Sequence, residues 1–206
     1  ISAAMVASAA CVPSFASGTQ PTATPAPAAT TTGQAAAPQS ENDAVAKIGD
    51  VTYDSLEGAI TKANPGDTIQ VLQDVTESVS ISKKITLTSA DPAKPATISG
   101  TITFGANSDG SEVTGLNFIL GEQQNVLQSI IVRGAKNVQI CENTFSIEDK
   151  DTKQSVQYTS IWLEQGTTEG TVISDNIFNL SNCPLKTGDT NSNVAIALQH
   201  LGAESF

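Results

Sequence analysis

The residue types best suited to chemistry are concentrated in one polar segment, residues 147–159. This segment contains three carboxylates and, near its end, an aromatic ring. Such side chains suit Ca2+, which is held by about six to eight oxygen atoms, and they suit the hydroxyl groups of sugars. A later segment, residues 180–193, is rich in Asn and Thr and adds amides. The candidate ligand-binding residues are therefore Glu148, Asp149, Asp151, Tyr158 and Asn191.

Three interpretations of these residues stay open. Glycan binding would use the carboxylates, the amide and the ring together. Ca2+ as a cofactor is the weaker alternative, because no carboxylate from a second segment completes the ligand set, and no metal ligands are assigned. The same composition is also typical of a solvated loop that binds nothing.

The other reactive residue types form no recognisable catalytic set. Arg133 is the only arginine and ends a predicted strand one repeat before Glu164, a spacing that favours a surface ion pair. Asp175 has no predicted partner, and the single histidine is His200. The chain has no Ser/His/Asp order, spaced Cys/His metal set or Gly-rich phosphate loop. Catalytic residues are therefore left unassigned.

An internal repeat sets the elements that would position these residues. Three segments, 111–118, 138–145 and 171–178, share an apolar third position and a final Phe, and these phenylalanines are 27 residues (118 to 145) and 33 residues (145 to 178) apart. Periods in this range are typical of solenoids. The shared positions hold Phe118, Phe145 and Phe178 and, two residues earlier, Leu116, Asn143 and Asn176. We expect the phenylalanines to stack inside the fold. We expect both asparagines at one bend, where Asn accepts left-handed backbone and its amide bonds the neighbouring turn.

Local signals predict the remaining elements. Residues 45–53 carry a turn at Gly49-Asp50 and predict a short hairpin or an edge strand. Residues 54–63 predict an amphipathic helix opened by a capping box from Asp54 to Glu57. After residue 67, short alternating strands follow, with two strand pieces in each later coil. Three variable connections, 119–128, 147–159 and 180–193, follow the repeated Phe. Stacking would place them on one edge, which in repeat proteins is often the binding face.

The N-terminal residues differ from this pattern. Residues 1–16 resemble the end of a partial secretory signal peptide, with Ser14 and Ala16 fitting the small-x-small cleavage rule. Residues 17–43 form a Thr-, Ala- and Pro-rich segment that is expected to be a disordered linker. The solenoid is expected over residues 44–206, truncated at its C-terminus. We therefore expect a secreted or cell-surface protein.

Charge and cysteine content limit the partners and the redox chemistry. Lys and Arg total 10 against 21 Asp and Glu, a formal net charge of −11 at pH 7. Nucleic acid and anionic lipid both attract cationic surfaces, so neither is an expected partner. No segment is long enough to predict a transmembrane helix. Beyond the leader, Cys141 and Cys183 occupy different positions in the repeat, which favours two separate thiols over a disulfide.

Residues near the start of the predicted solenoid carry a family resemblance. The matching positions are Ile48-Gly49-Asp50, Tyr53, Leu56, Ala59-Ile60, Ala63, Pro65-Gly66-Asp67-Thr68-Ile69, Val71-Leu72 and Asp74-Val75, followed by turns of the form Val-x-Ile-x-x-Asn-x-Phe. This run resembles secreted bacterial right-handed parallel β-helix proteins of the pectin-lyase-like superfamily, over about residues 44–206. The resemblance implies an all-β solenoid with a short N-terminal capping helix and parallel strands about 4.8 Å apart.

The function expected from these features is non-catalytic binding of a polysaccharide or of a host or matrix protein, or the role of a structural stalk. The superfamily also includes polysaccharide lyases that combine Asp-bound calcium with a basic residue. The alternative is therefore a polysaccharide lyase or glycoside hydrolase whose active coils lie beyond residue 206.

Overall fold

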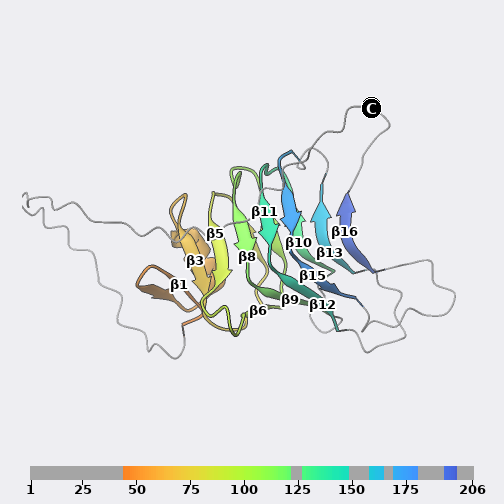
Figure 1. Cartoon of the computed structure of the whole chain (residues 1–206). Coiled ribbons are helices and arrows are strands. Elements are labelled where there is room, and N and C mark those ends of the chain that lie inside the picture. Colours follow the sequence, from red (N-terminus) through yellow and green to blue (C-terminus); the bar gives the residue numbers. More distant parts are fainter. Residues whose placement is uncertain (1–43, 122–126, 149–157, 165–168, 181–192, 199–206) are drawn as a thin grey trace, which may run out of the picture. The chain divides into compact units, whose positions relative to one another are not determined.

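The computed structural model describes residues 44–121, 127–148, 158–164, 169–180 and 193–198. The chain divides into two units, residues 1–39 and 40–206, and all described residues lie in the second. Within these residues the structure is all-β apart from one helix (Figure 1). None of the described helical structure is long and apolar enough to cross a membrane.

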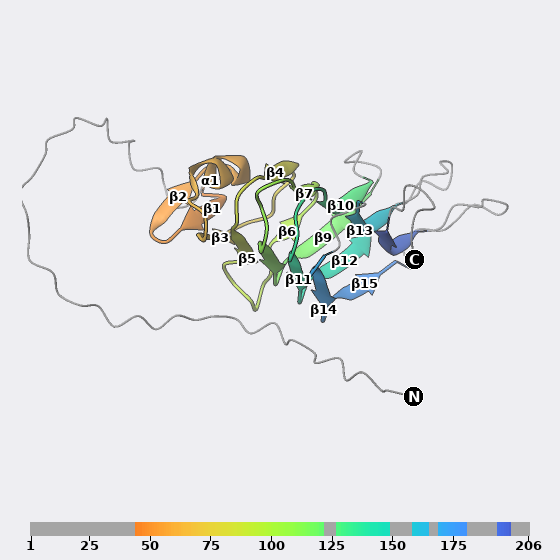
Figure 2. The same cartoon turned by 90° about the horizontal axis from the view of Figure 1, so that it is seen from above.

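The first described elements are a hairpin and the helix. Strands β1 (Ala46–Ile48) and β2 (Val51–Tyr53) pair antiparallel, and the turn between them includes Gly49 with a φ of 57°. This confirms the predicted hairpin. Helix α1 (Leu56–Lys62) follows and buries its apolar stripe, and Figure 2 shows it beside β1 and β2.

The N-terminus of α1 differs from the prediction by one residue. Ser55 is the N-cap, and its hydroxyl accepts a hydrogen bond from the backbone N–H of Gly58 at 3.1 Å. The predicted capping box from Asp54 to Glu57 is therefore wrong. The position three residues after the cap is a glycine, which has no side chain to return the bond.

Residues outside the helix form hydrogen bonds with groups at both of its ends. The carboxylate of Glu77 accepts hydrogen bonds from the first two backbone N–H groups of α1, each at 3.0 Å. At the other end, the Lys83 Nζ donates to the carbonyls of Thr61 and Ala63 at 3.1 and 2.9 Å. The unpaired groups that every helix end leaves are thus matched by charges of the favourable sign.

The remaining strands form three sheets with parallel pairing. The seven-stranded sheet consists of β3 (Thr68–Val71), β5 (Thr86–Ser89), β8 (Glu112–Thr114), β11 (Gln139–Cys141) and β14 (Val172–Ser174), with β1 and β2 added antiparallel at one edge. The four-stranded sheet consists of β6 (Thr97–Ile98), β9 (Asn117–Leu120), β12 (Thr144–Ile147) and β15 (Ile177–Asn179). The five-stranded sheet consists of β4 (Val79–Ile81), β7 (Ile102–Phe104), β10 (Gln128–Val132), β13 (Thr159–Leu163) and β16 (Val194–Leu198).

Along the chain, successive strands belong to the three sheets in a fixed cyclic order. From β5 onward, each cycle takes one strand from the seven-, the four- and the five-stranded sheet in turn, and we call one cycle a coil. In the first coil, Val75 takes the place of a strand of the four-stranded sheet and forms a single parallel bridge to Ile98. Each later coil thus has three strands rather than the predicted two. This order is compatible with a β-helix-like solenoid, and Figure 1 shows β3, β5, β8 and β11 side by side.

Alternating burial explains why the three sheets enclose one core. Strands β4 and β7 bury their first and third residues, as expected for strands with one face inward. The inward side chains form one continuous apolar cluster that includes residues from all three sheets and from α1.

The repeated phenylalanines form a column within this core. The rings of Phe118 and Phe145 lie 5.0 Å apart at 13°, and those of Phe145 and Phe178 lie 5.0 Å apart at 9°. Phe118 and Phe145 are fully buried, and Phe178 packs against the core from a partly buried position. The parallel register of β9, β12 and β15 brings the three residues together.

The two asparagines connect successive coils. The Asn143 Oδ1 accepts the backbone N–H of Leu116 at 3.1 Å, and its Nδ2 donates to the Val113 carbonyl at 3.0 Å. Asn176 repeats this one coil later, accepting from the backbone N–H of Asn143 at 2.9 Å and donating to the Ile140 carbonyl at 2.7 Å. Each amide thus pairs with one backbone N–H and one backbone carbonyl of the equivalent bend one coil earlier.

The left-handed backbone expected of these asparagines falls one residue earlier. Positive φ angles occur at Gly115 (65°), Glu142 (57°) and Asp175 (57°), the equivalent positions of three successive coils. The asparagines contribute the amide hydrogen bonds, and the residue before each takes the left-handed conformation at the turn. The prediction that the asparagines themselves take this conformation is wrong.

Cys141, at the end of β11, is fully buried and disulfide-bonded. The expectation of a separate thiol is therefore wrong for this residue. Its partner lies outside the described residues.

Candidate functional site

The predicted ligand-binding residues are only partly described. Glu148 is exposed directly after β12, and its backbone N–H donates to the Leu120 carbonyl at 2.8 Å. Asp149, Asp151 and Asn191 lie outside the described residues. Their part in glycan or Ca2+ binding stays a prediction. Within the described ranges, no three His, Cys, Asp or Glu residues lie close enough to hold a metal ion.

Tyr158 does not present its ring to solvent. It is 1 % exposed and packs with Leu120 and Ile147 in a small apolar cluster separate from the main core. Its backbone carbonyl accepts from the N–H of Val194 at 2.8 Å. The sequence suggested an aromatic group at the tip of a polar loop, and this placement is wrong. Apolar neighbours from adjacent strands enclose the ring, although the residues before it in the sequence are polar.

The ends of the three variable connections stack as predicted. Each connection joins a strand of the four-stranded sheet to a strand of the five-stranded sheet. Leu120 is in register with Ile147 at the starts of two connections. Gln128, Thr159 and Val194 are in register at their ends. The three connections therefore lead into β10, β13 and β16 at the same end of these neighbouring strands.

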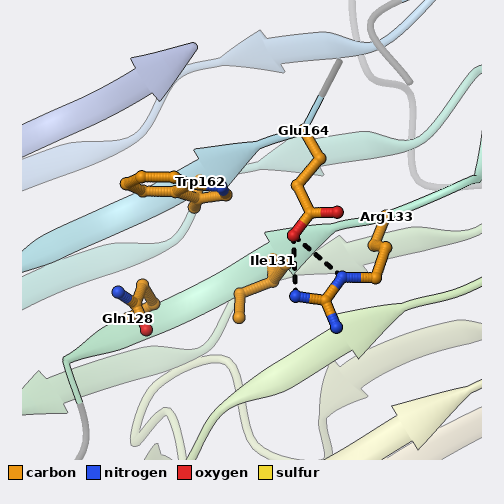
Figure 3. Close-up of a pocket in the computed structure, with 5 residues that line it drawn as sticks. All are labelled: Gln128, Ile131, Arg133, Trp162 and Glu164. Atoms are coloured by element: carbon orange, nitrogen blue, oxygen red, sulfur yellow. Dashed lines mark hydrogen bonds and ion pairs between the residues drawn. The ribbon is translucent and has the colours of Figure 1, made fainter. Parts of the chain in front are cut away.

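A hollow of about 190 Å³ lies on the outer face of the five-stranded sheet and runs along β10, from its first residue to the residue that follows it. Its lining comes from two neighbouring strands and the residues that follow them: Gln128, Ile131, Arg133, Trp162 and Glu164. In Figure 3 the Trp162 ring lies above Gln128 and to the left of Ile131, and the Arg133–Glu164 pair lies to the right of Ile131. We call this feature the Trp162 hollow.

The strand pattern explains why the lining residues face outward. In β13, Ile161 and Leu163 belong to the core, so Trp162 between them points away from it. In the parallel register, Trp162 lies beside Ile131 of β10. Gln128 also faces the hollow, because the next two residues of β10 are both buried and the simple alternation is broken there.

An ion pair borders the hollow and spans two coils. The Arg133 Nη2 and Nε both bond to the Glu164 Oε1, at 2.7 and 2.8 Å. Backbone hydrogen bonds hold both residues: the N–H of Glu164 donates to the Val132 carbonyl at 3.0 Å, and the N–H of Arg133 donates to the Phe104 carbonyl at 2.7 Å. The Arg133 side chain is 62 % exposed and that of Glu164 is 24 % exposed. The hydrogen bond that Arg133 donates to Glu164, and then the negative charge of Glu164, raise the pKa of the Arg133 guanidinium above its ordinary value. The predicted surface pair is thus confirmed.

Sequence reasoning did not select Trp162, Ile131 or Gln128 as site residues. Trp162 is the only tryptophan of the chain, and its place between two inward apolar residues was a usable signal for an outward ring. Gln128 carried no such signal, because its orientation depends on the irregular start of β10.

The side chains of the hollow offer several groups that can bind a ligand. The indole offers a flat apolar face and an N–H donor, and the Gln128 amide offers a donor and an acceptor. Arginine stays charged at any physiological pH and does not transfer protons. The arrangement suits a ligand with one apolar face and several hydroxyl groups.

Comparison with known protein families, with characterised proteins and with solved structures finds no match to this chain. A function can therefore be assigned only from the geometry of the site.

Proposed function

We propose that the chain is a secreted or cell-surface protein built on a right-handed parallel β-helix of the pectin-lyase-like type, and that it binds glycan without catalysis. The binding site is the Trp162 hollow. The observation that carries the proposal is the outward ring of Trp162, set in a hollow of about 190 Å³ between an amide and an ion pair.

The ring favours a sugar as the ligand. One face of a pyranose consists of C–H groups, and covering this face with an indole removes apolar area from water. Trp162 lies within a strand that pairs on both sides, with β10 and β16. A ring on such a support loses little conformational entropy on binding, which improves affinity.

The polar groups favour the same ligand. The Gln128 amide can donate to one hydroxyl and accept from another. Charged partners strengthen hydrogen bonds to neutral hydroxyls, and the Arg133–Glu164 pair lies on the side of Ile131 opposite to Gln128. The ligand would thus be held over its apolar face and along both rims.

Two other features support the finer parts of the proposal. The cycle of strands through three sheets, with stacked Phe and Asn residues, is the arrangement expected of a parallel β-helix. The leader-like residues 1–16 and the Pro-rich residues 17–43 favour export followed by a spacer.

Binding can be measured directly, because the only tryptophan of the full chain lies in the proposed site. Titration with soluble oligosaccharides of glucan, xylan, mannan and polygalacturonate should change the Trp162 fluorescence for at least one of them. Calorimetry with that oligosaccharide should then show an affinity lower by about tenfold or more for Trp162→Ala, since buried tryptophans commonly dominate binding energy. Trp162→Phe keeps a ring and should lose less.

Ile177→Ala is a matched control, because Ile177 is an exposed apolar residue (59 %) on β15 of a different sheet. It should bind like the wild type. Equal affinity of Trp162→Ala and the wild type would contradict the proposal. Release of unsaturated or reducing sugar during the incubation would instead support a lyase or hydrolase, and absence of both binding and turnover would support a stalk.

A further inference from the structure

The lining of the Trp162 hollow contains one cation and one anion, and the two are already paired. Arg133 is the only arginine of the chain, and both of its bonds to Glu164 are shorter than 3 Å. An acidic sugar would have to attract Arg133 away from Glu164 or share it. Sharing would place two carboxylates near each other, and like charges at close range repel.

The charge of the whole chain acts in the same direction. Its formal net charge is −11 at pH 7, so a polyanion approaches against the mean field. A neutral polysaccharide experiences neither the long-range repulsion nor the competition for Arg133.

We infer that the ligand of the Trp162 hollow is a neutral glycan, and that Glu164 is a specificity residue which rejects acidic glycans by keeping Arg133 occupied. The inference rests on the proposed glycan-binding function and names its ligand class. It follows a general rule of recognition, in which a site discriminates by repelling the wrong partner as well as attracting the right one.

Glu164 is suited to this role by its position. It follows β13 directly, and its backbone N–H is fixed to the preceding coil at 3.0 Å. Its side chain is less than half as exposed as that of Arg133. The carboxylate therefore stays beside the guanidinium, and an incoming anion meets a pair rather than a free cation.

The experiment compares a neutral and an acidic oligosaccharide of equal length, a xylan or glucan hexamer and a galacturonate hexamer, by Trp162 fluorescence at moderate salt. The wild-type chain should bind the neutral hexamer at least about tenfold more tightly. Glu164→Gln keeps the side-chain shape but removes the negative charge. It should improve binding of the acidic hexamer by about three- to tenfold relative to the neutral one, because Arg133 is then available to a carboxylate.

A second ion pair of the same kind provides the matched control. Lys136 and Glu169 also bridge two coils, but neither lines the hollow. Glu169→Gln changes the net charge by the same amount as Glu164→Gln. It should leave the neutral-to-acidic ratio close to that of the wild type. Thermal melting of both variants checks that each is folded.

The outcomes separate this inference from the proposed function. Tighter binding of the acidic hexamer by the wild-type chain contradicts the inference and leaves glycan binding intact. An unchanged ratio in Glu164→Gln, or an equal change in Glu169→Gln, shows that Glu164 is not the specificity residue. No fluorescence response to either hexamer, or to the other oligosaccharides, contradicts glycan binding itself.

Discussion

The inward column of phenylalanines and the outward row that contains Trp162 run through the same coils, but they differ in how far the residue type is repeated from coil to coil. Inside, Phe118, Phe145 and Phe178 repeat one residue type, and each ring stacks on the next. Outside, the residues in register from β4 to β16 are all different: Ser80, Thr103, Ile131, Trp162 and Ala197. An inward residue must fit the coils before and after it, whereas an outward residue need not. The repeat therefore specifies the fold, and binding can be built on two coils without altering it.

The largest effect is expected from the middle of the inward column. Phe145→Ala removes a fully buried ring that stacks on both of its neighbours. It should lower the free energy of unfolding by about 3–5 kcal/mol, the usual cost of such a cavity. Urea denaturation followed by Trp162 fluorescence measures the change. Phe178→Ala, at a partly buried position with one stacking partner among the described residues, should cost clearly less. Equal losses for the two variants would show that the column is not a cooperative stack.

An intermediate effect is expected from the asparagine bonds between coils. Asn143→Ala leaves a backbone N–H of Leu116 and a carbonyl of Val113 without the amide that pairs them in the bend. An unsatisfied buried polar group costs about 1–3 kcal/mol, so the free energy of unfolding should fall by at least that amount. Hydrogen exchange at the Leu116 amide is a local measurement of the same event. Continued protection of this amide in the variant would contradict the assigned bond.

The smallest effect on stability is expected from the outward row. Trp162→Ala removes a partly exposed ring outside the core, and the free energy of unfolding should change by about 1 kcal/mol or less. Urea denaturation monitored by circular dichroism measures this without the tryptophan. A loss similar to that of Phe145→Ala would mean that the ring is part of the core, and the contrast between the two rows would fail.

Much of the fold could be predicted from sequence, because an inward repeat leaves a periodic signal. The spacing of Phe118, Phe145 and Phe178 indicated aligned parallel strands. The number of strands in a coil was less accessible, since the bend at Glu142 contains neither Gly nor Pro to mark the break. The left-handed residues at Glu142 and Asp175 were missed for the same reason.

The site was less predictable, because its residues occur once. The Arg133–Glu164 pair was expected from spacing along the repeat, whereas Trp162 has no counterpart in other coils to reveal a pattern. Tyr158 is buried by Leu120 and Ile147. Leu120 lies one coil earlier, and Ile147 lies at the other end of the connection that precedes Tyr158. Local composition therefore gave the wrong environment for this ring.

The contacts at the ends of α1 have a consequence for the order of folding. A helix of seven residues is too short to persist alone in water. The groups that complete its two ends, Glu77 and Lys83, lie on either side of β4. We therefore expect the helix to become stable only when the first coil has formed, and not to nucleate folding.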